Sequence, residues 1–388
     1  MDRTYALIIG AGPYGVGVAE ALYAAGVDFR IVGEPFQLWQ HHTLSTMFLR
    51  SDWNASSIYD PGNQLSFRRW LDADASRGER IVEERIPIDL YRQYLTELTE
   101  NRPYKIHHGR VTSVEGPREQ GARYRAVTDD GTVIEAQEVV VATGIGPHRF
   151  LPESLQQLPQ DRVLHSWDTE AIEALEDRRV LVLGSGQSAA ETVEALEPRN
   201  EIVWGLRHEP RFFREPLRVP TPIFKAILAV SPAYYFLPQA VRTPLTKSSF
   251  KATMTPNYRA LYGSENIPKI FGNAEDLGLR ESGSGIEGPK VGKVDAVVSC
   301  TGYRGQIGNL RFLAEDLRQR LGAADSAPDL DRHFRSRLPG LYFTGGIAEG
   351  TFGPAQRFIL GSFFACRRIS QSIVEGAAVD GAIAAKAA

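Results

Sequence analysis

A glycine-rich turn near the amino terminus has the spacing of a dinucleotide-binding fingerprint. It lies between an apolar run at Thr4–Ile9 and a helix-like stretch at Val16–Ala25, and it reads Gly10-Ala11-Gly12-Pro13-Tyr14-Gly15. In that context Gly10 permits a tight turn, Gly12 lets a pyrophosphate approach the backbone, and Gly15 allows close packing of helix and strand. The first turn of the helix offers unpaired N–H groups to phosphates. We therefore expect this turn to hold the pyrophosphate of a dinucleotide.

The same arrangement occurs a second time in the middle of the chain. The second fingerprint reads Gly184-Ser185-Gly186-Gln187-Ser188-Ala189. Alanine is an accepted variant in the last position. The apolar pattern predicts a strand before it at Arg179–Leu183, a helix after it at Ala189–Leu196 and a further strand at Glu201–Leu206. Two dinucleotide sites are therefore expected in one chain.

The residue that should contact the ribose carries opposite charges in the two copies. Glu34 follows the second strand of the first copy, and a carboxylate accepts hydrogen bonds from ribose hydroxyls while it repels a 2′-phosphate. Arg207 occupies the equivalent place in the second copy, with Arg211 and Arg214 close behind, and a guanidinium can bind a 2′-phosphate through two parallel hydrogen bonds. FAD in the first site and NADPH in the second is the simplest interpretation. The alternatives are a solvated loop residue for Glu34 and a surface cation for Arg207.

The pattern around the first fingerprint predicts a parallel α/β unit. Continuous apolar runs are typical of strands covered on both faces, and they occur at Thr4–Ile9, Val27–Val32 and Glu138–Ala142. Asp130-Gly131 is a hairpin turn signal among shorter segments. We expect an antiparallel meander there, with strands at Tyr104–Val114, Tyr124–Thr128 and Thr132–Ala136.

Repetition of the opening pattern predicts an α/β fold with two Rossmann-like dinucleotide-binding domains, the second inserted in the first. The FAD-binding domain is expected at residues 1–150 plus 291–375, the NADPH-binding domain at 151–290 and a tail at 376–388. Later strands are expected at Asp295–Ser299 and Leu341–Phe343, and a helix at Phe352–Glu375.

An apolar, proline-broken segment at 220–244 has three interpretations. It could belong to the packing surface of the second domain, or it could form a lid or pocket wall for a hydrophobic substrate. A shallow membrane contact is the third interpretation, and it requires an amphipathic face with basic residues. Only Lys225 and Arg242 flank the segment, so this interpretation ranks last.

These residues resemble the two-dinucleotide-binding flavoproteins and, within them, the class B flavin-dependent monooxygenases. That family includes flavin-containing monooxygenases, Baeyer–Villiger monooxygenases and ornithine or lysine N-hydroxylases. The similarity spans residues 4–370 and is carried by an A-T-G motif at Ala142–Gly144, the run G-S-G-Q-S-A-A-E at Gly184–Glu191 and a T-G-Y motif at Thr301–Tyr303. The family's F-x-G-x-x-x-H motif survives here only as His165-Ser166, so it does not define the subclass.

The resemblance implies a set of residues for each cofactor. Those for FAD come from the first fingerprint and from segments that follow strands: Gly10, Gly12, Pro13, Tyr14, Gly15, Glu34, Trp39, Gln40, Val111, Ala142, Thr143, Gly144, Gly345 and Gly346. Those for NADPH come from the second fingerprint, its charged slot and the T-G-Y motif: Gly184, Gly186, Gln187, Ser188, Ala189, Arg207, Thr301, Gly302 and Tyr303.

The resemblance also implies a reaction. Flavin would take hydride from NADPH and react with O₂ to give a C4a-(hydro)peroxide, which would oxygenate a small hydrophobic or amine-containing metabolite. Such a species needs a site closed to water and a hydrogen-bond donor near its distal oxygen. Arg50, Asp52 and Asn54 are the candidate catalytic residues. Each could equally cap a loop or lie on the surface.

Composition excludes several other classes. The 388 residues carry a net charge of −3 without a basic block, which argues against nucleic acid as a partner. No apolar run is long enough to span a membrane, and an apolar strand almost at Met1 indicates no secretion signal, so a cytoplasmic setting is expected. The histidines lack neighbouring ligands for a metal. Cys300 and Cys366 form no C-x-x-C pair, which disfavours a thioredoxin-reductase-like enzyme.

Two other functions stay open at this point. The chain could be an FAD-dependent oxidoreductase that passes electrons from NAD(P)H to a quinone-like acceptor without oxygenation. It could also be a non-catalytic dinucleotide sensor, although intact glycines in both fingerprints argue against that. The expected partners are a small-molecule substrate and O₂, and the sequence leaves a homo-oligomer open.

Overall fold

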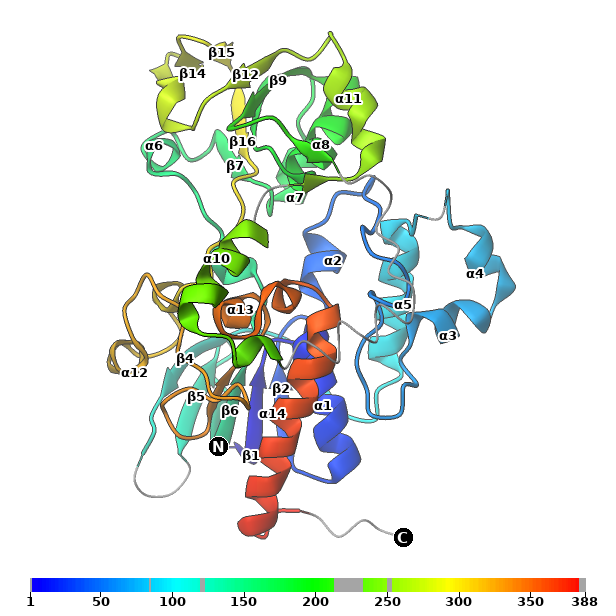
Figure 1. Cartoon of the computed structure of the whole chain (residues 1–388), viewed down its shortest axis with the longest axis vertical. Coiled ribbons are helices and arrows are strands. Elements are labelled where there is room, and N and C mark those ends of the chain that lie inside the picture. Colours follow the sequence, from blue (N-terminus) through cyan, green and yellow to red (C-terminus); the bar gives the residue numbers. More distant parts are fainter. Residues whose placement is uncertain (1, 84, 119–122, 213–232, 250–252, 384–388) are drawn as a thin grey trace.

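The structure is a computed structural model that describes residues 2–83, 85–118, 123–212, 233–249 and 253–383 (Figure 1). Two α/β units lie one above the other along the long axis of the molecule, with β1, β2 and β6 in the lower unit and β9, β12 and β16 in the upper one. Each unit has its own sheet. None of the described helices is long and apolar enough to cross a membrane.

The sheet of the lower unit is built around β1 (Asp2–Ile9), whose residues Ala6, Leu7 and Ile8 are fully buried. Parallel neighbours flank it, namely β2 (Phe29–Val32) and β6 (Val133–Val141). The short strand β17 (Leu341–Phe343) pairs parallel with the end of β6. A central strand covered on both faces explains the continuous apolar run in the sequence.

The meander differs from the expectation at both ends. The predicted strand at Tyr104–Val114 is two strands, because β3 (Ile106–His107) pairs parallel with β2 and only β4 (Val111–Glu115) pairs antiparallel with β5 (Tyr124–Thr128). The predicted strands at Thr132–Ala136 and Glu138–Ala142 are one strand, β6. Its first half pairs with β5 and its second half with β17, so a single strand serves both partners.

The upper sheet is entirely parallel. Its order is β12-β9-β8-β16-β7, with bounds Lys269–Phe271, Glu201–Leu206, Arg179–Leu183, Ala296–Ser299 and Val163–His165. Helix α8 (Gln187–Leu196) follows β8 as the fingerprint predicted. Because β16 lies between β8 and β7, the expected domain boundary at residue 291 falls too early, and the chain returns to the lower unit only after Ser299.

The carboxy-terminal helix also begins later than expected. The predicted helix at Phe352–Glu375 is interrupted after α13 (Glu349–Phe352), since Gly353 has a φ of +87° and Pro354 follows it. A turn leads to α14 (Leu360–Val379), which packs against α1 (Pro13–Ala25). The contact is close, because a Cβ on Gly17 would lie 2.8 Å from the sulfur of buried Cys366.

The remaining elements surround these two sheets. The helices among them are α2 (Gln37–His41), α3 (Phe67–Asp72), α4 (Ala75–Glu79), α5 (Ile88–Glu100), α6 (Glu153–Gln156), α7 (Thr169–Glu173), α10 (Gln239–Ser249), α11 (Arg259–Gly263) and α12 (Glu315–Leu321). The strands are β10 (Arg211–Phe212), β11 (Thr253–Met254), β13 (Arg280–Ser282), β14 (Gly285–Gly288) and β15 (Gly292–Val294).

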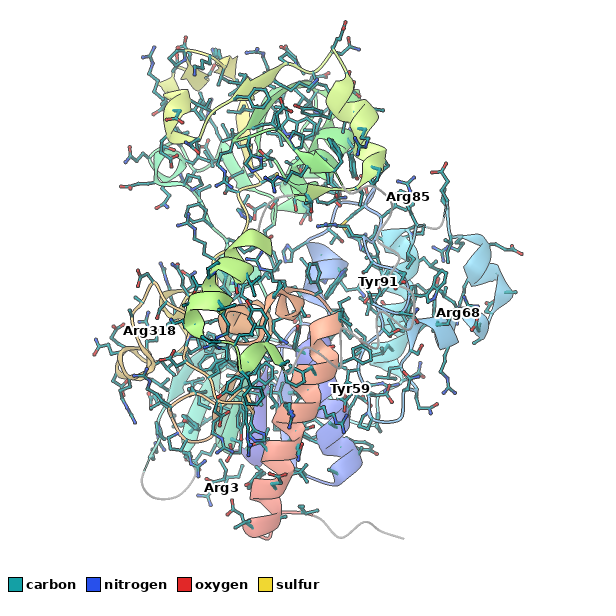
Figure 2. The ribbon with its side chains drawn as sticks, viewed as in Figure 1. Arg3, Tyr59, Arg68, Arg85, Tyr91 and Arg318 are labelled. Carbon is teal, nitrogen blue, oxygen red and sulfur yellow. The ribbon has the colours of Figure 1, made fainter. Side chains whose placement is uncertain are left out.

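Helix α5 fixes the loop that carries the candidate catalytic residues. The hydroxyl of Tyr91, labelled in Figure 2, donates to the carbonyl of Ser56 at 2.8 Å. The Tyr94 hydroxyl accepts from the Ile58 N–H at 3.2 Å and donates to the Leu65 carbonyl. Both tyrosines are buried, so these contacts hold the chain after Asn54 against the body of the lower unit.

Part of the proline-broken segment packs on the lower unit. Residues 220–232 of that segment lie outside the described residues. The ring of Tyr235 stacks on Phe352 of α13 at 5.7 Å, and Arg242 donates to the Thr351 carbonyl at 3.2 Å. Within this segment Tyr235 and Arg242 therefore contact α13 of the lower unit, whereas a packing surface of the second domain was one expectation.

A substitution in the first fingerprint tests the close packing of α1 on the turn after β1. A Cβ on Gly15 would overlap the carbonyl oxygen of Gly10, so Gly15→Ala should lower the free energy of unfolding by about 1–3 kcal/mol or more. Gly78→Ala in α4 is the matched control, because a Cβ there has nothing within 4 Å. Urea denaturation measures both, and an unchanged midpoint for Gly15→Ala would contradict the packing described.

Candidate functional site

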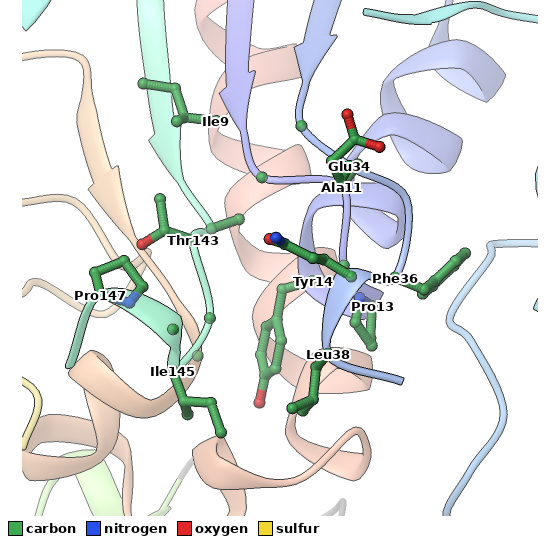
Figure 3. Close-up of a pocket in the computed structure, with 18 of the residues that line it drawn as sticks. Ile9, Ala11, Pro13, Tyr14, Glu34, Phe36, Leu38, Thr143, Ile145 and Pro147 are labelled. Atoms are coloured by element: carbon green, nitrogen blue, oxygen red, sulfur yellow. The ribbon is translucent and has the colours of Figure 1, made fainter. Parts of the chain in front are cut away.

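A cavity of about 420 Å³ opens at the carboxyl edge of the lower sheet (Figure 3). This size is typical of a small-molecule site, and ligands of open parallel sheets bind at this edge. The wall comes from segments that follow β1, β2, β6 and β17 and from the turn before α14. Twelve residues predicted for FAD line it: Gly10, Gly12, Pro13, Tyr14, Glu34, Trp39, Val111, Ala142, Thr143, Gly144, Gly345 and Gly346.

The first fingerprint forms one wall of this cavity. Gly10 has a φ of +109°, and a Cβ there would overlap the backbone of Ala142. Gly12 is the N-cap of α1 and has no side chain to cap the first N–H groups of the helix. A Cβ on Gly12 would meet nothing within 4 Å. The amino-terminal N–H groups of α1 therefore face open space, which fits a pyrophosphate.

Glu34 lines the cavity after the end of β2, where the sequence predicts a contact with ribose. Figure 3 shows its carboxylate directed away from Tyr14. The imidazole Nδ1 of His108 lies 3.3 Å from a carboxylate oxygen of Glu34. Sequence analysis did not find His108, because it follows β3 and comes close only through the parallel pairing of β3 with β2.

Two residues predicted for FAD are not among those that line the cavity. The side chain of Gln40 donates to the Arg92 carbonyl at 3.3 Å and to the Thr96 hydroxyl at 3.1 Å, so it is directed toward α5. Gly15 lies behind the turn, against Gly10. The structure therefore gives Gln40 a role in packing α2 on α5 and gives Gly15 a role in helix–strand contact.

The cavity wall includes residues that the sequence did not single out. Trp167 belongs to the upper unit and lines the cavity. The ring of His42, which follows α2, stacks on Trp167 with the ring centroids 3.9 Å apart. Gln356 lies in the turn before α14 and is completely buried, yet neither polar atom of its carboxamide has a hydrogen-bond partner. An orphaned carboxamide and an open helix terminus both fit a large polar ligand such as FAD.

The second fingerprint has the same backbone geometry in the upper unit. Gly184 has a φ of +157°, and a Cβ there would lie 2.7 Å from the carbonyl oxygen of Cys300. Gly186 is the N-cap of α8, again without a side-chain cap. Ser188 is exposed and Ala189 is buried. An open helix terminus is thus present at the second site as well.

Arg207 lies beside this second turn. It follows β9 and is exposed, and its backbone N–H donates to the Ser185 hydroxyl at 3.0 Å. This bond ties the loop that carries the guanidinium to the fingerprint, as binding of a 2′-phosphate would require. Arg211 is exposed nearby in β10, whereas Arg214 lies outside the described residues.

Gln187 points into the protein at this site. Its amide donates to Glu191 at 3.0 Å and to the Thr255 hydroxyl at 3.3 Å, and its oxygen accepts from the Thr255 N–H at 3.0 Å. Burial raises the pKa of Glu191 to about 7, against the opposing effects of Gln187 and Arg50. Gln187 therefore supports α8 from behind.

The T-G-Y motif lies at the crossing between the units. The Thr301 hydroxyl donates to the Phe150 carbonyl at 2.6 Å, and the Gly302 carbonyl lies 3.2 Å from Nε2 of His165. The Tyr303 ring packs edge-on against His165 at 5.1 Å. These residues thus link the two connecting segments that run between the units. The sequence had instead grouped them with the second fingerprint as NADPH-binding residues.

The three candidate catalytic residues do not line the cavity. Asp52 accepts a hydrogen bond from the Ala55 N–H at 3.0 Å, which is a loop-capping contact. Arg50 is largely buried and approaches the Thr253 hydroxyl at 3.5 Å, and desolvation lowers its pKa although Glu191 opposes this. Asn54 is partly exposed. Arg50 thus lies between the loop of the lower unit and β11 of the upper one.

A family model described as L-lysine 6-monooxygenase/L-ornithine 5-monooxygenase matches residues 5–253. The chain belongs to this family. An L-ornithine N(5)-monooxygenase from Burkholderia cepacia is 25% identical over 318 residues, which cover 69% of this chain and 69% of the relative.

Solved structures of the same kind share the fold. The reduced ornithine hydroxylase from Pseudomonas aeruginosa is similar with a TM-score of 0.75 and 18% identity, over 96% of this chain and 99% of that chain. L-lysine 6-monooxygenase from Pseudomonas syringae gives a TM-score of 0.73 and 19% identity, over 98% and 100%. The predicted α/β fold with two dinucleotide-binding domains is confirmed. Family membership confirms the predicted class of FAD- and NADPH-dependent monooxygenases.

The role of Arg207 beside the second fingerprint can be tested by substitution. Arg207→Ala should weaken NADPH binding about tenfold or more while NADH binding changes little, because only NADPH carries the 2′-phosphate. Arg280→Ala is the control, since this exposed arginine lies in β13, away from the fingerprint. Steady-state flavin reduction with each nucleotide measures the preference, and an unchanged NADPH/NADH ratio would rule out this role for Arg207.

Proposed function

We propose that this chain is an NADPH-dependent flavin monooxygenase that oxygenates a small metabolite, with an amine nitrogen as the favoured acceptor atom. The observation that carries the proposal is the pair of open fingerprints with Glu34 beside one and Arg207 beside the other. Membership of the lysine/ornithine monooxygenase family supports the nitrogen. When bound, FAD would supply the redox chemistry, namely acceptance of hydride from NADPH and activation of O₂.

The chain's own residues would bind and orient the cofactors. The N–H groups at the start of α1 would hold the pyrophosphate, and Glu34 would accept hydrogen bonds from the ribose. The equivalent start of α8 would hold the pyrophosphate of NADPH, and Arg207 its 2′-phosphate. The exclusion of water would come from apolar groups in the cavity wall, of which Ile145, Pro147 and Ile359 are examples.

The position of Trp167 supports transfer between the two sites. This residue belongs to the upper unit and lines the cavity of the lower one, so the two units meet at the cavity. A nicotinamide held by the upper unit would enter beside Trp167. Arg50, which lies between the units, remains a candidate for a contact with substrate or nucleotide, together with Asp52 and Asn54.

The cysteines do not favour transfer of electrons to a disulfide. Burial raises the pKa of the Cys300 thiol to about 12 and that of Cys366 further still. Because the thiolate is the reactive form, neither sulfur is suited to exchange at neutral pH. The alternative of electron transfer to a quinone-like acceptor is decided by experiment.

Stopped-flow spectroscopy tests the proposal. The FAD-loaded protein is reduced with NADPH and then mixed with O₂. A monooxygenase should show a transient whose spectrum differs from both oxidised and reduced flavin, because the site shields the oxygenated species from water. In a companion assay, hydroxylated product should form as NADPH is consumed with lysine or ornithine as trial amines. Direct return to oxidised flavin, with rapid turnover on a quinone, would instead support the oxidoreductase.

A further inference from the structure

The turn before α14 carries a polar group that the proposed function does not yet use. Gln356 has no exposed surface, lines the FAD cavity, and has neither Oε1 nor Nε2 in a hydrogen bond. A buried amide without a partner costs about 1–3 kcal/mol. A residue with this cost is expected to gain a partner in the functional state.

The backbone of this turn is held in place by Tyr14. The Tyr14 hydroxyl lies 2.8 Å from the Gln356 carbonyl and 2.9 Å from the Phe358 carbonyl. Tyr14 itself belongs to the first turn of α1, whose N–H groups would hold the pyrophosphate. The contact therefore fixes the backbone of Gln356 relative to the fingerprint, and the side-chain torsions are what would direct the carboxamide to a ligand.

The surroundings identify which part of FAD the carboxamide would meet. Figure 3 shows Tyr14, Ile145 and Leu38 on the side of the cavity away from Glu34, and all four residues line it. The adenosine would lie at the Glu34 end, so the isoalloxazine would lie at the Tyr14 end. Apolar groups there suit a flat ring, and a carboxamide both donates and accepts.

We propose that the side chain of Gln356 hydrogen-bonds the pyrimidine edge of the isoalloxazine, and that Tyr14 is the positioning residue for it. That edge carries two carbonyl acceptors and one N–H donor, which a carboxamide can match. A donor at this edge stabilises the negative charge of reduced flavin. The inference rests on the proposed function, since it requires FAD in the cavity.

Gln356→Met tests the contact through measurements other than turnover. The apoprotein should melt at the same temperature or higher, because an unpaired buried amide is removed. FAD should bind about tenfold more weakly, since its ring loses a hydrogen-bond partner. The visible spectrum of the bound flavin should shift and its midpoint potential should fall.

Two further variants and a control sharpen the result. Gln356→Glu should lower the potential further than Gln356→Met, because it brings a negative charge to the ring. Tyr14→Phe should give a smaller fall in the same direction, with no added effect in the Gln356→Met background. Gln371→Met is the matched control, since Gln371 is exposed on α14 and its side chain donates to Glu375 at 2.9 Å.

The possible results separate this inference from the proposed function. Failure of the wild-type protein to take up FAD would contradict the proposed function. Normal uptake with the same spectrum and potential in Gln356→Met would overturn the inference alone. Weaker FAD binding with an unchanged spectrum and potential would place the contact on the ribityl chain or phosphates, and would also overturn it. A lower melting temperature of the apoprotein would indicate a structural role instead.

Discussion

The close approach of backbone to backbone at the end of β1 is the constraint on which the cavity depends. Gly10 must turn with a positive φ against Ala142, and Gly15 must pack on the carbonyl of Gly10. A side chain at either place would push α1 away from the sheet. Because no side chain intervenes, the free N–H groups of α1 face the space enclosed by the segments after β6 and β17. The cavity thus depends on this close backbone packing as much as on the polar groups that line it.

The upper unit repeats this constraint with another charge beside it. Gly184 turns against Cys300 as Gly10 turns against Ala142, yet Arg207 takes the place of Glu34. We propose that similar backbone turns serve two nucleotides, with the charge of Glu34 or Arg207 selecting between them. The crossing between the units, fixed by Thr301 and its bond to Phe150, then determines how the two sites face each other.

The sequence predicted what depends on local rules. Glycine spacing, apolar runs and the charge after the second strand identified β1, α1, β8, α8 and twelve of the residues that line the cavity, because each depends on a few neighbouring residues. It did not predict contacts set by distant pairing. β16 joins the upper sheet through β8 and β7, and His108 reaches Glu34 through β3. The late start of α14 depends on Gly353, and the burial of Gln356 has no signal in the local sequence.

The central claim is that the cavity at the end of β1 holds FAD in every chain. The most direct measurement is the amount of flavin released when the purified, flavin-saturated protein is denatured, identified by chromatography and divided by the amount of protein. The account predicts one FAD, and not FMN, for each chain. Protein that remains colourless after incubation with FAD, and that releases no flavin when unfolded, would contradict it.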